Sequence, residues 1–170
     1  MEDYINRLKL NGFEGFYSVY NLKNNINVIP KDPGIYKILR LTNDAPIFLK
    51  KGVGGFFKGR DPNCPIEKLE TNWIENEPLM YIGKAGSIKR NLRRRLNEYM
   101  LFGQGEDIGH WGGRLIWQLS DYDELIVCWK ILKDIDPRAY EKKFLINFKK
   151  VNGKYCLLYT SPSPRDPKTS

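Results

Sequence analysis

The chain of 170 residues, 41% hydrophobic and 28% charged, has the composition of one soluble globular domain and not that of a disordered chain. Its apolar runs are too short for a membrane helix, its N-terminus lacks a secretory signal and its three cysteines are scattered, so we expect a cytoplasmic protein. With 28 Lys and Arg against 20 Asp and Glu, its net charge of +8 favours a polyanionic partner, nucleic acid before an anionic membrane.

Residues 1–29 are predicted to form a helical extension of the domain. Tyr4 and Leu8 have helical spacing and precede a break that begins at Gly12. Residues 16–20 fit either a short helix or a strand, and the pattern does not decide between them.

Two strand signals follow, separated by a long insertion. The turn at residues 32–34 leads into a β-like run over residues 35–40, and a second run covers residues 79–82. Residues 42–78 form the insertion between them, which includes a basic stretch at residues 56–60.

A basic amphipathic helix is predicted next. Ser87 suits the N-cap position, and the core-facing stripe comprises Ile88, Leu92, Leu96 and Tyr99. Six basic side chains gather within twelve positions: Lys84, Lys89, Arg90, Arg93, Arg94 and Arg95. Because no broad apolar face accompanies them, a membrane-surface role is disfavoured.

The rest of the chain adds a loop, a strand and a helix. Residues 103–113 are Gly-rich and predict a loop, and residues 125–132 have the pattern of a buried strand. Asp136 and Pro137 suit the N-cap and first position of a last helix. The side chains expected to face inward from it are Phe144, Leu145, Phe148 and Val151. The whole predicts one α/β (α+β) domain with a mostly antiparallel, three-stranded sheet flanked by helices.

Two charged side chains fall on inward helix faces. Glu141 is either a boundary residue that reaches water, the partner of an arginine, or a metal ligand, because an unpaired buried carboxylate is unfavourable. Arg95 shares a helix face with Tyr99. It either lies near the core, where it can pair with Glu141 or a phosphate, or extends to solvent at the helix edge. The single histidine, His110, excludes HNH-type and HExxH-type metal centres.

Two tripeptides give these residues a context. Gly34-Ile35-Tyr36 and Tyr81-Ile82-Gly83 each fall on a predicted strand, and Lys84-Ala85 and Arg95-Leu96-Asn97-Glu98-Tyr99 follow. In this order they resemble the motifs of the GIY-YIG nuclease family, and in particular the nuclease subunit of bacterial nucleotide excision repair. Ala139-Tyr140-Glu141 resembles the helix that carries the family's metal-binding glutamate.

The resemblance covers residues 30–155 and implies a metal-dependent endonuclease that hydrolyses phosphodiester bonds of DNA, with RNA as an alternative substrate. It implies that Tyr36 and Tyr81 lie side by side, and that one of them activates or orients the attacking water. The neighbouring Lys84, Arg95 and a cation would lower the pKa of such a tyrosine from its usual value near 10 toward the working pH.

The same resemblance assigns the remaining roles in the site. Arg95 would hold the scissile phosphate, Tyr99 would assist at the attacking or leaving oxygen, and Lys84 would support them. Glu141 would bind one divalent metal ion, Mg²⁺ or Mn²⁺, together with water and phosphate oxygens.

Further residues are candidates for nucleic-acid contact. The insertion resembles that of the restriction-enzyme branch of the family, which makes Lys58 and Arg60 candidates, although ordinary surface roles are equally compatible. Phosphate contacts are also expected from Lys89, Arg90 and Arg94, and Arg94 is an alternative counterpart of the family's arginine. His110 either aids the site as the loop folds back or caps the Gly-rich loop. A restriction role on duplex DNA favours a homodimer.

The last fifteen residues differ from the rest of the chain. The run that begins at Cys156 reads CLLYTSPSPRD, as a translated sequencing adapter does, so residues 156–170 are expected to be a non-native tail rather than a natural Pro-rich one. The family's asparagine, about a dozen residues after the glutamate, would then be missing unless Asn152 takes its place.

Three other functions are alternatives to a GIY-YIG nuclease. The same fold can act as a catalytically silent DNA- or RNA-binding module. A nuclease of the (D/E)xK class would use Asp123, Glu141 and Lys143. A basic adaptor for acidic proteins would need no chemistry at all.

Overall fold

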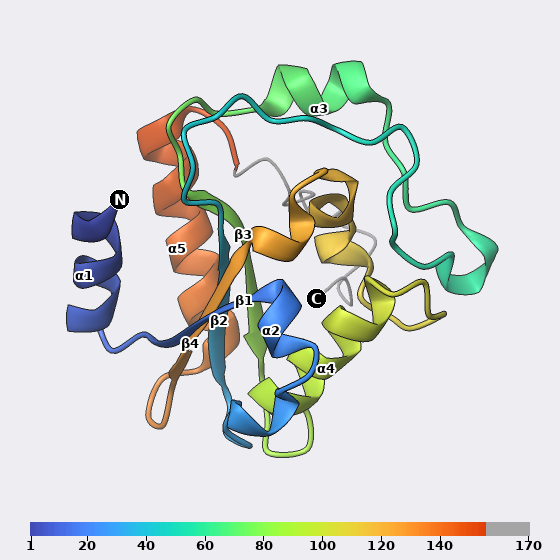
Figure 1. The fold of residues 1–170 in the computed structure, drawn as a ribbon. Helices are drawn as coiled ribbons and strands as arrows, with labels where there is room; N and C mark the ends of the chain where they lie inside the picture. Colours follow the sequence, from blue (N-terminus) through green and yellow to red (C-terminus); the bar gives the residue numbers. More distant parts are fainter. Residues whose placement is uncertain (156–170) are drawn as a thin grey trace.

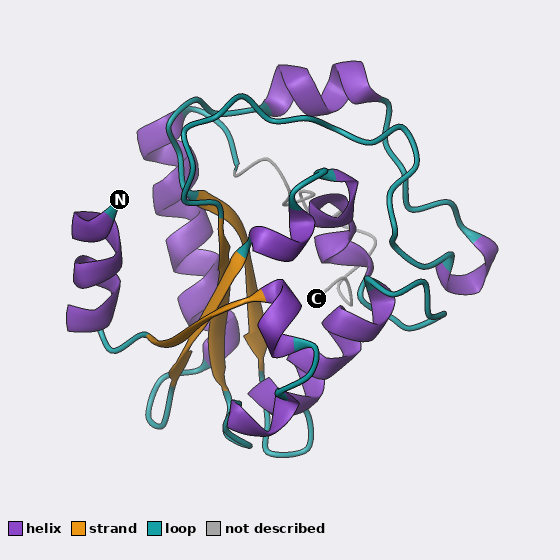
Figure 2. Cartoon of the chain, viewed as in Figure 1, coloured by secondary structure: helices purple, strands orange, loops and turns teal. Residues whose placement is uncertain are grey.

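A four-stranded antiparallel sheet forms the centre of the molecule (Figures 1 and 2). In the computed structural model, which describes residues 1–155, its strands are β1 (Glu14–Ser18), β2 (Gly34–Leu39), β3 (Leu79–Ala85) and β4 (Ile126–Ile131). They lie in the order β1-β4-β2-β3, so β2 is internal and β3 forms one edge. The expected mixed class, helices around an antiparallel sheet, is confirmed.

The strand β1 corrects the expected number of three strands. Residues 14–18 pair with β4 through an irregularity at Phe16, where φ is 60°. The chain then passes directly into the short helix α2 (Val19–Leu22), which the Ser18 side chain caps. Residues 16–20 fit both helix and strand because they contain the end of one and the start of the other.

One face of the sheet is covered by α5 (Pro137–Asn152), with α1 (Glu2–Leu10) near it at the edge of the molecule (Figure 1). Asp136 caps α5 as predicted, since its carboxylate accepts a hydrogen bond from the Arg138 backbone N–H at 3.2 Å. Val151, expected inward, is 74% exposed. At 3.6 residues per turn, the buried stripe through Leu145 and Phe148 continues to Asn152 instead.

The other face is covered by α2 and by α4 (Leu92–Phe102). The predicted start of α4 at Ser87 is wrong, because Asn91 is the N-cap and accepts a hydrogen bond from the Arg94 backbone N–H at 2.9 Å. Ser87 instead closes a turn by accepting a bond from the Arg90 N–H at 3.0 Å. Ile88 lies before the helix and is 69% exposed, so it does not belong to the core stripe.

The insertion packs against the domain rather than forming a free surface loop. Phe48 makes a β-bridge with Leu119, and the Gln118 side chain donates hydrogen bonds to the carbonyls of Leu49 and Cys64 at 3.0 and 2.9 Å. Both N–H groups of the buried Gln118 amide therefore have hydrogen-bond partners. Through them, one core residue binds two distant parts of the insertion.

Short helices complete the fold, and one of them corrects the predicted loop at residues 103–113. Its last residues belong to the 3₁₀ helix η3 (Trp111–Gln118), whose buried Trp117 packs in the core. The other short elements are α3 (Ile66–Asn72) in the insertion and the 3₁₀ helices η1 (Ile26–Val28), η2 (Phe57–Gly59) and η4 (Tyr122–Glu124).

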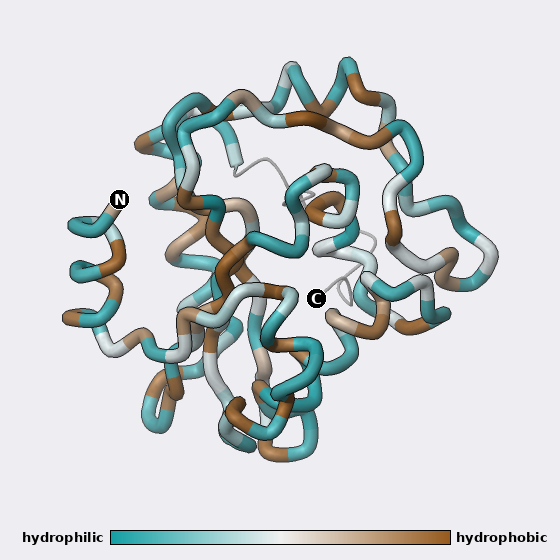
Figure 3. Tube along the Cα trace, viewed as in Figure 1, coloured by the Kyte–Doolittle hydropathy of each residue, from teal (hydrophilic) through white to brown (hydrophobic). Residues whose placement is uncertain are grey.

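Hydrophobic segments run along the strands at the centre of the molecule (Figure 3). They divide into two clusters, one on each face of the sheet, as the alternation of side chains along a strand requires. Within residues 1–155, none of the helices has both the length and the apolar character of a membrane span. The expected tail, residues 156–170, lies outside the described residues.

The substitution Gly83→Ala tests the tightest contact between β2 and β3. A Cβ at position 83 would overlap the Tyr36 ring, so we expect the free energy of unfolding to fall by about 1–3 kcal/mol in urea denaturation. Gly86→Ala is the matched control, since nothing lies within 4 Å of a Cβ there. Equal losses in the two variants would contradict the overlap.

Candidate functional site

Two tyrosines meet on the face of the sheet that α4 covers. Tyr36 of β2 pairs with Gly83 of β3, and Ile38 pairs with Tyr81, so both tyrosine side chains point to the same side. Their ring centroids are 6.2 Å apart. The side-by-side arrangement expected for Tyr36 and Tyr81 is therefore present.

His110 completes this cluster from a distant part of the chain. Its Nε2 lies 2.8 Å from the Tyr36 hydroxyl, and its ring stacks on Tyr99 with centroids 3.8 Å apart and planes 8° from parallel. Of the two arrangements predicted for His110, the structure has the one in which its loop folds back on the tyrosines. His110 is only 1% exposed, however, so in this state it cannot contact a ligand at the surface.

Tyr99, from α4, completes the cluster on the side of the His110 ring on which it stacks. Its hydroxyl donates a 2.6 Å hydrogen bond to the Gly113 carbonyl, and its ring lies edge-on to Tyr81 at 5.6 Å. Gly112 and Gly113 approach the hydroxyls of Tyr81 and Tyr99 so closely that larger side chains would crowd them. The start of η3 therefore covers the tyrosines.

Burial determines the protonation of the cluster. It raises the pKa of Tyr36 and of Tyr81 well above the usual 10, because a buried phenolate loses its hydration. The predicted lowering of this pKa by neighbouring cations is therefore wrong for this state of the protein. For Tyr36 the Arg95 guanidinium and a hydrogen bond with Tyr81 act in the opposite direction. Burial, with the charge of Arg95, lowers the pKa of His110 well below 6.5. All three groups are neutral at pH 7. In the tautomer with its proton on Nδ1, His110 accepts a hydrogen bond from the Tyr36 hydroxyl at Nε2.

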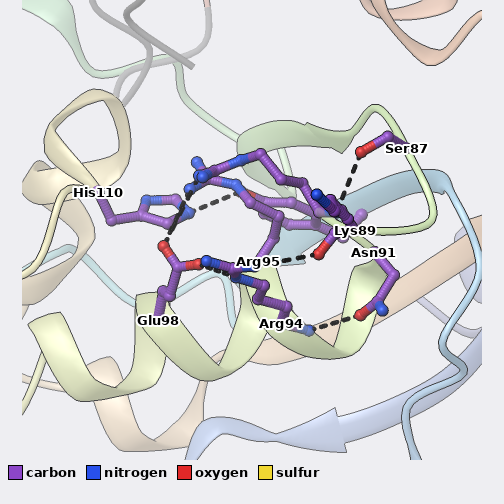
Figure 4. A network of polar contacts seen from close by, with 9 residues as sticks. Ser87, Lys89, Asn91, Arg94, Arg95, Glu98 and His110 are labelled. Carbon is purple, nitrogen blue, oxygen red and sulfur yellow. Dashed lines mark hydrogen bonds and ion pairs between the residues drawn. The ribbon is translucent and has the colours of Figure 1, made fainter.

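Arg95 lies beside these aromatic rings and is 2% exposed, as expected for the arginine nearest the core. Its Nη1 lies 3.3 Å from the Glu98 carboxylate, which also accepts ion pairs from Arg94 at 3.4 Å and Arg90 at 3.8 Å. Figure 4 shows Arg94, Arg95 and Glu98 projecting from α4, with His110 opposite them. The carboxylate next to Arg95 is therefore that of Glu98, which the sequence reasoning missed.

Glu141 and Lys84 form a separate pair on the other face of the sheet, against α5. The Lys84 Nζ lies 3.4 Å from Oε1 of Glu141, and the two side chains are 16% and 11% exposed. Burial raises the pKa of Glu141, and the charge of Lys84 opposes this. Glu141 also raises the pKa of Tyr36 and Tyr81, so its charge reaches the tyrosines around the edge strand β3.

The chemistry of Glu141 fits only a sparsely coordinated cation. No group of three or more His, Cys, Asp or Glu side chains suited to a metal occurs within residues 1–155. One carboxylate suits Mg²⁺ when water and phosphate oxygens supply the other positions, as this ion prefers. Asn152, the alternative family asparagine, donates to the Phe148 carbonyl at 3.1 Å in the last turn of α5.

The other predicted contact residues lie on two separate surfaces. Lys89 and Arg90 are exposed in the turn before α4 and Arg94 in its first turn, whereas Lys58 and Arg60 are exposed on the insertion. The residues of the (D/E)xK alternative are not brought together. Asp123 pairs with Lys23 at 2.7 Å, Glu141 pairs with Lys84, and Lys143 is exposed.

Comparisons of the chain with protein-family models, with curated proteins and with solved structures find no match. The candidate site consists of the neutral Tyr81, Tyr36 and His110 series, the buried Arg95 beside it, and the Glu141 and Lys84 pair across the edge strand.

The buried, neutral state of His110 predicts a pH dependence of stability. Since its folded pKa is depressed, the unfolded chain binds more protons below pH 6.5, and stability is lost as the pH falls from there. We expect the free energy of unfolding to fall by up to about 1.4 kcal/mol per pH unit between pH 6.5 and 5. Urea denaturation across this range measures it.

His110→Gln is the control for this experiment, because glutamine keeps a polar group near Tyr36 but does not titrate. His110 is the single histidine of the chain, so the variant should show a flatter profile between pH 6.5 and 5. Identical profiles for the two proteins would refute the assignment of the pH dependence to His110.

Proposed function

We propose that the chain is a metal-dependent endonuclease of the GIY-YIG type, which hydrolyses phosphodiester bonds of DNA. The observation that carries the proposal is the hydrogen-bonded series of Tyr36 and His110, 2.8 Å apart, with the buried Arg95 and Glu141 acting on it electrostatically. Two tyrosines, an arginine and a carboxylate around one strand edge provide a base, a phosphate-binding cation and a metal ligand.

Proton transfer uses the tautomer of His110 whose Nε2 accepts a hydrogen bond from the Tyr36 hydroxyl. As a water oxygen forms its bond to phosphorus, its proton passes to the Tyr36 oxygen, and the Tyr36 proton passes to Nε2 of His110. The bond from phosphorus to the leaving oxygen breaks, and that oxygen takes a proton from solvent water. A neutral His110 is needed for this relay, and its lowered pKa keeps it neutral.

Charge relief at the phosphate is the role of Arg95 and its neighbours. A guanidinium presents two N–H groups to two phosphate oxygens, which an ammonium cannot do in a fixed geometry. Arg90 and Arg94 share the Glu98 carboxylate with Arg95, so the three arginines lie around one anion position. We assign the scissile phosphate to this position, with Lys89 beside it.

Glu141 would hold the cation, Mg²⁺ or Mn²⁺, in place of the Lys84 ammonium that now neutralises it. When bound, the cation would supply charge neutralisation at the phosphate and at the leaving oxygen. Lys84, no longer paired with Glu141, would be available to the phosphate, which is the supporting role expected for it. Tyr99 keeps His110 in position by stacking.

The full burial of Tyr36 sets a condition on this function. A substrate reaches its hydroxyl only when Gly112 and Gly113, at the start of η3, move away from the tyrosines while His110 stays stacked on Tyr99. The same burial favours a second candidate, a silent DNA- or RNA-binding module in which the cover stays closed. We further propose that the protein is cytoplasmic. Cleavage of both strands of a duplex would require a homodimer.

Nicking of supercoiled plasmid in Mg²⁺ or Mn²⁺ tests the proposal. Tyr36→Phe, Arg95→Gln and Glu141→Gln should each lower the nicking rate by about 100-fold or more, since each removes a group that acts at the reacting phosphate. The melting temperature of each variant is measured in parallel to confirm that it folds.

The matched controls make the same chemical changes at exposed positions: Tyr20→Phe, Arg7→Gln and Glu67→Gln. These should nick at the rate of the unchanged protein. Full activity in both Arg95→Gln and Glu141→Gln would refute the site. DNA binding by the unchanged protein without any nicking would favour the silent module.

A further inference from the structure

Two arginines from different parts of the chain pack on one indole ring. The guanidinium carbon of Arg60 lies 4.5 Å from the centroid of Trp111, and that of Arg114 lies 4.7 Å from it. Arg60 comes from the insertion and is exposed, whereas Trp111 and Arg114 belong to η3 and are partly buried. The two cations are therefore no farther apart than the sum of these distances.

The structure holds this arrangement in place from both sides. Arg114 donates from Nη1 to the Trp111 carbonyl at 3.1 Å. The insertion is fixed against the neighbouring segment by a bond from the Gly55 N–H to the Phe102 carbonyl at 2.9 Å. A side chain at Gly55 would overlap the Glu106 carbonyl. Arg60 thus approaches the indole from a fixed part of the insertion, which limits its loss of entropy on binding a ligand.

The charges of this pair are not neutralised by a carboxylate. Within residues 1–155 no ion pair involves Arg60 or Arg114. Asp61, the neighbour of Arg60, accepts hydrogen bonds from Asn63 at 2.9 and 2.7 Å instead. Burial lowers the pKa of Arg114, and Arg60 lowers it further. Two like charges held on one indole ring attract the phosphates of a polyanion.

We propose that Arg60 and Arg114, held on Trp111, form a subsite for the phosphodiester backbone of a nucleic acid strand. A guanidinium group that packs on an indole ring still has N–H groups that can bind phosphate oxygens, and Arg114 uses only its Nη1 for the Trp111 carbonyl. Trp111 directly follows His110, which lies 2.8 Å from the Tyr36 hydroxyl. The subsite therefore takes phosphates next to the scissile one, and in this respect it rests on the proposed function.

Its test is a binding measurement that needs no catalysis. Fluorescence anisotropy with a labelled DNA duplex, in EDTA, gives the dissociation constant at several salt concentrations. Arg60→Gln and Arg114→Gln should each weaken binding by about 5- to 10-fold and reduce the salt slope by about one. Lys68→Gln, which removes one exposed charge from the same insertion, should change binding by less than about twofold.

Three results would overturn the subsite. As a control for folding, Arg60→Gln should melt at the temperature of the unchanged protein, because Arg60 is exposed. Unchanged DNA affinity and salt slope in that variant would overturn the proposal, as would the absence of DNA binding by the unchanged protein. Saturable inorganic phosphate binding that Arg60→Gln abolishes, with DNA affinity intact, would assign the pair to free phosphate and also overturn it. Failure of plasmid nicking, by contrast, refutes the proposed catalysis and leaves this binding result standing.

Discussion

The candidate site depends on the contact between Tyr36 and Gly83. The Tyr36 ring occupies the space where any larger residue at position 83 would place its Cβ, so it crosses the neighbouring strand rather than standing upright from its own. That position brings its hydroxyl to His110 and its ring beside Tyr81 and Tyr99. This cluster also belongs to the hydrophobic core on that face of the sheet. A substitution of one of these tyrosines therefore changes both the candidate site and the packing of the core.

The insertion between β2 and β3 makes contacts with the domain that a short hairpin turn could not make. It bridges to Leu119, contacts the segment after α4 and brings Arg60 to Trp111. Through Trp111 and the next turn of η3 it is continuous with the residues that cover the tyrosines. A ligand that binds the insertion therefore contacts the same short segment that has to move before Tyr36 becomes accessible.

Much of the fold could be predicted from sequence patterns that are compatible with only one local structure. The strands β2, β3 and β4 and the cap of α5 were predictable, because burial and the Asp-Pro pair leave few alternatives. The start of α4 was not, because Ser87 and Asn91 are both good caps and only the packing of Leu92 on the domain selects the second. The site followed from a family resemblance for Tyr36, Tyr81, Arg95 and Glu141. Glu98 was within reach of the (i, i+3) and (i, i+4) rules, whereas the His110 contact joins residues 74 positions apart, which no local rule provides.

Glu98 has a further consequence for how the arginines around it behave. It is a counterion that belongs to the chain itself, shared by Arg90, Arg94 and Arg95. Three guanidinium groups and one carboxylate carry a net charge of about +2 at this position, where three arginines alone would carry +3. If a phosphate binds there, as we propose, the position would therefore add less salt dependence than three arginines would suggest. The displaced carboxylate would stay tethered to α4 and would compete with the bound anion, which would favour dissociation of a cleaved strand.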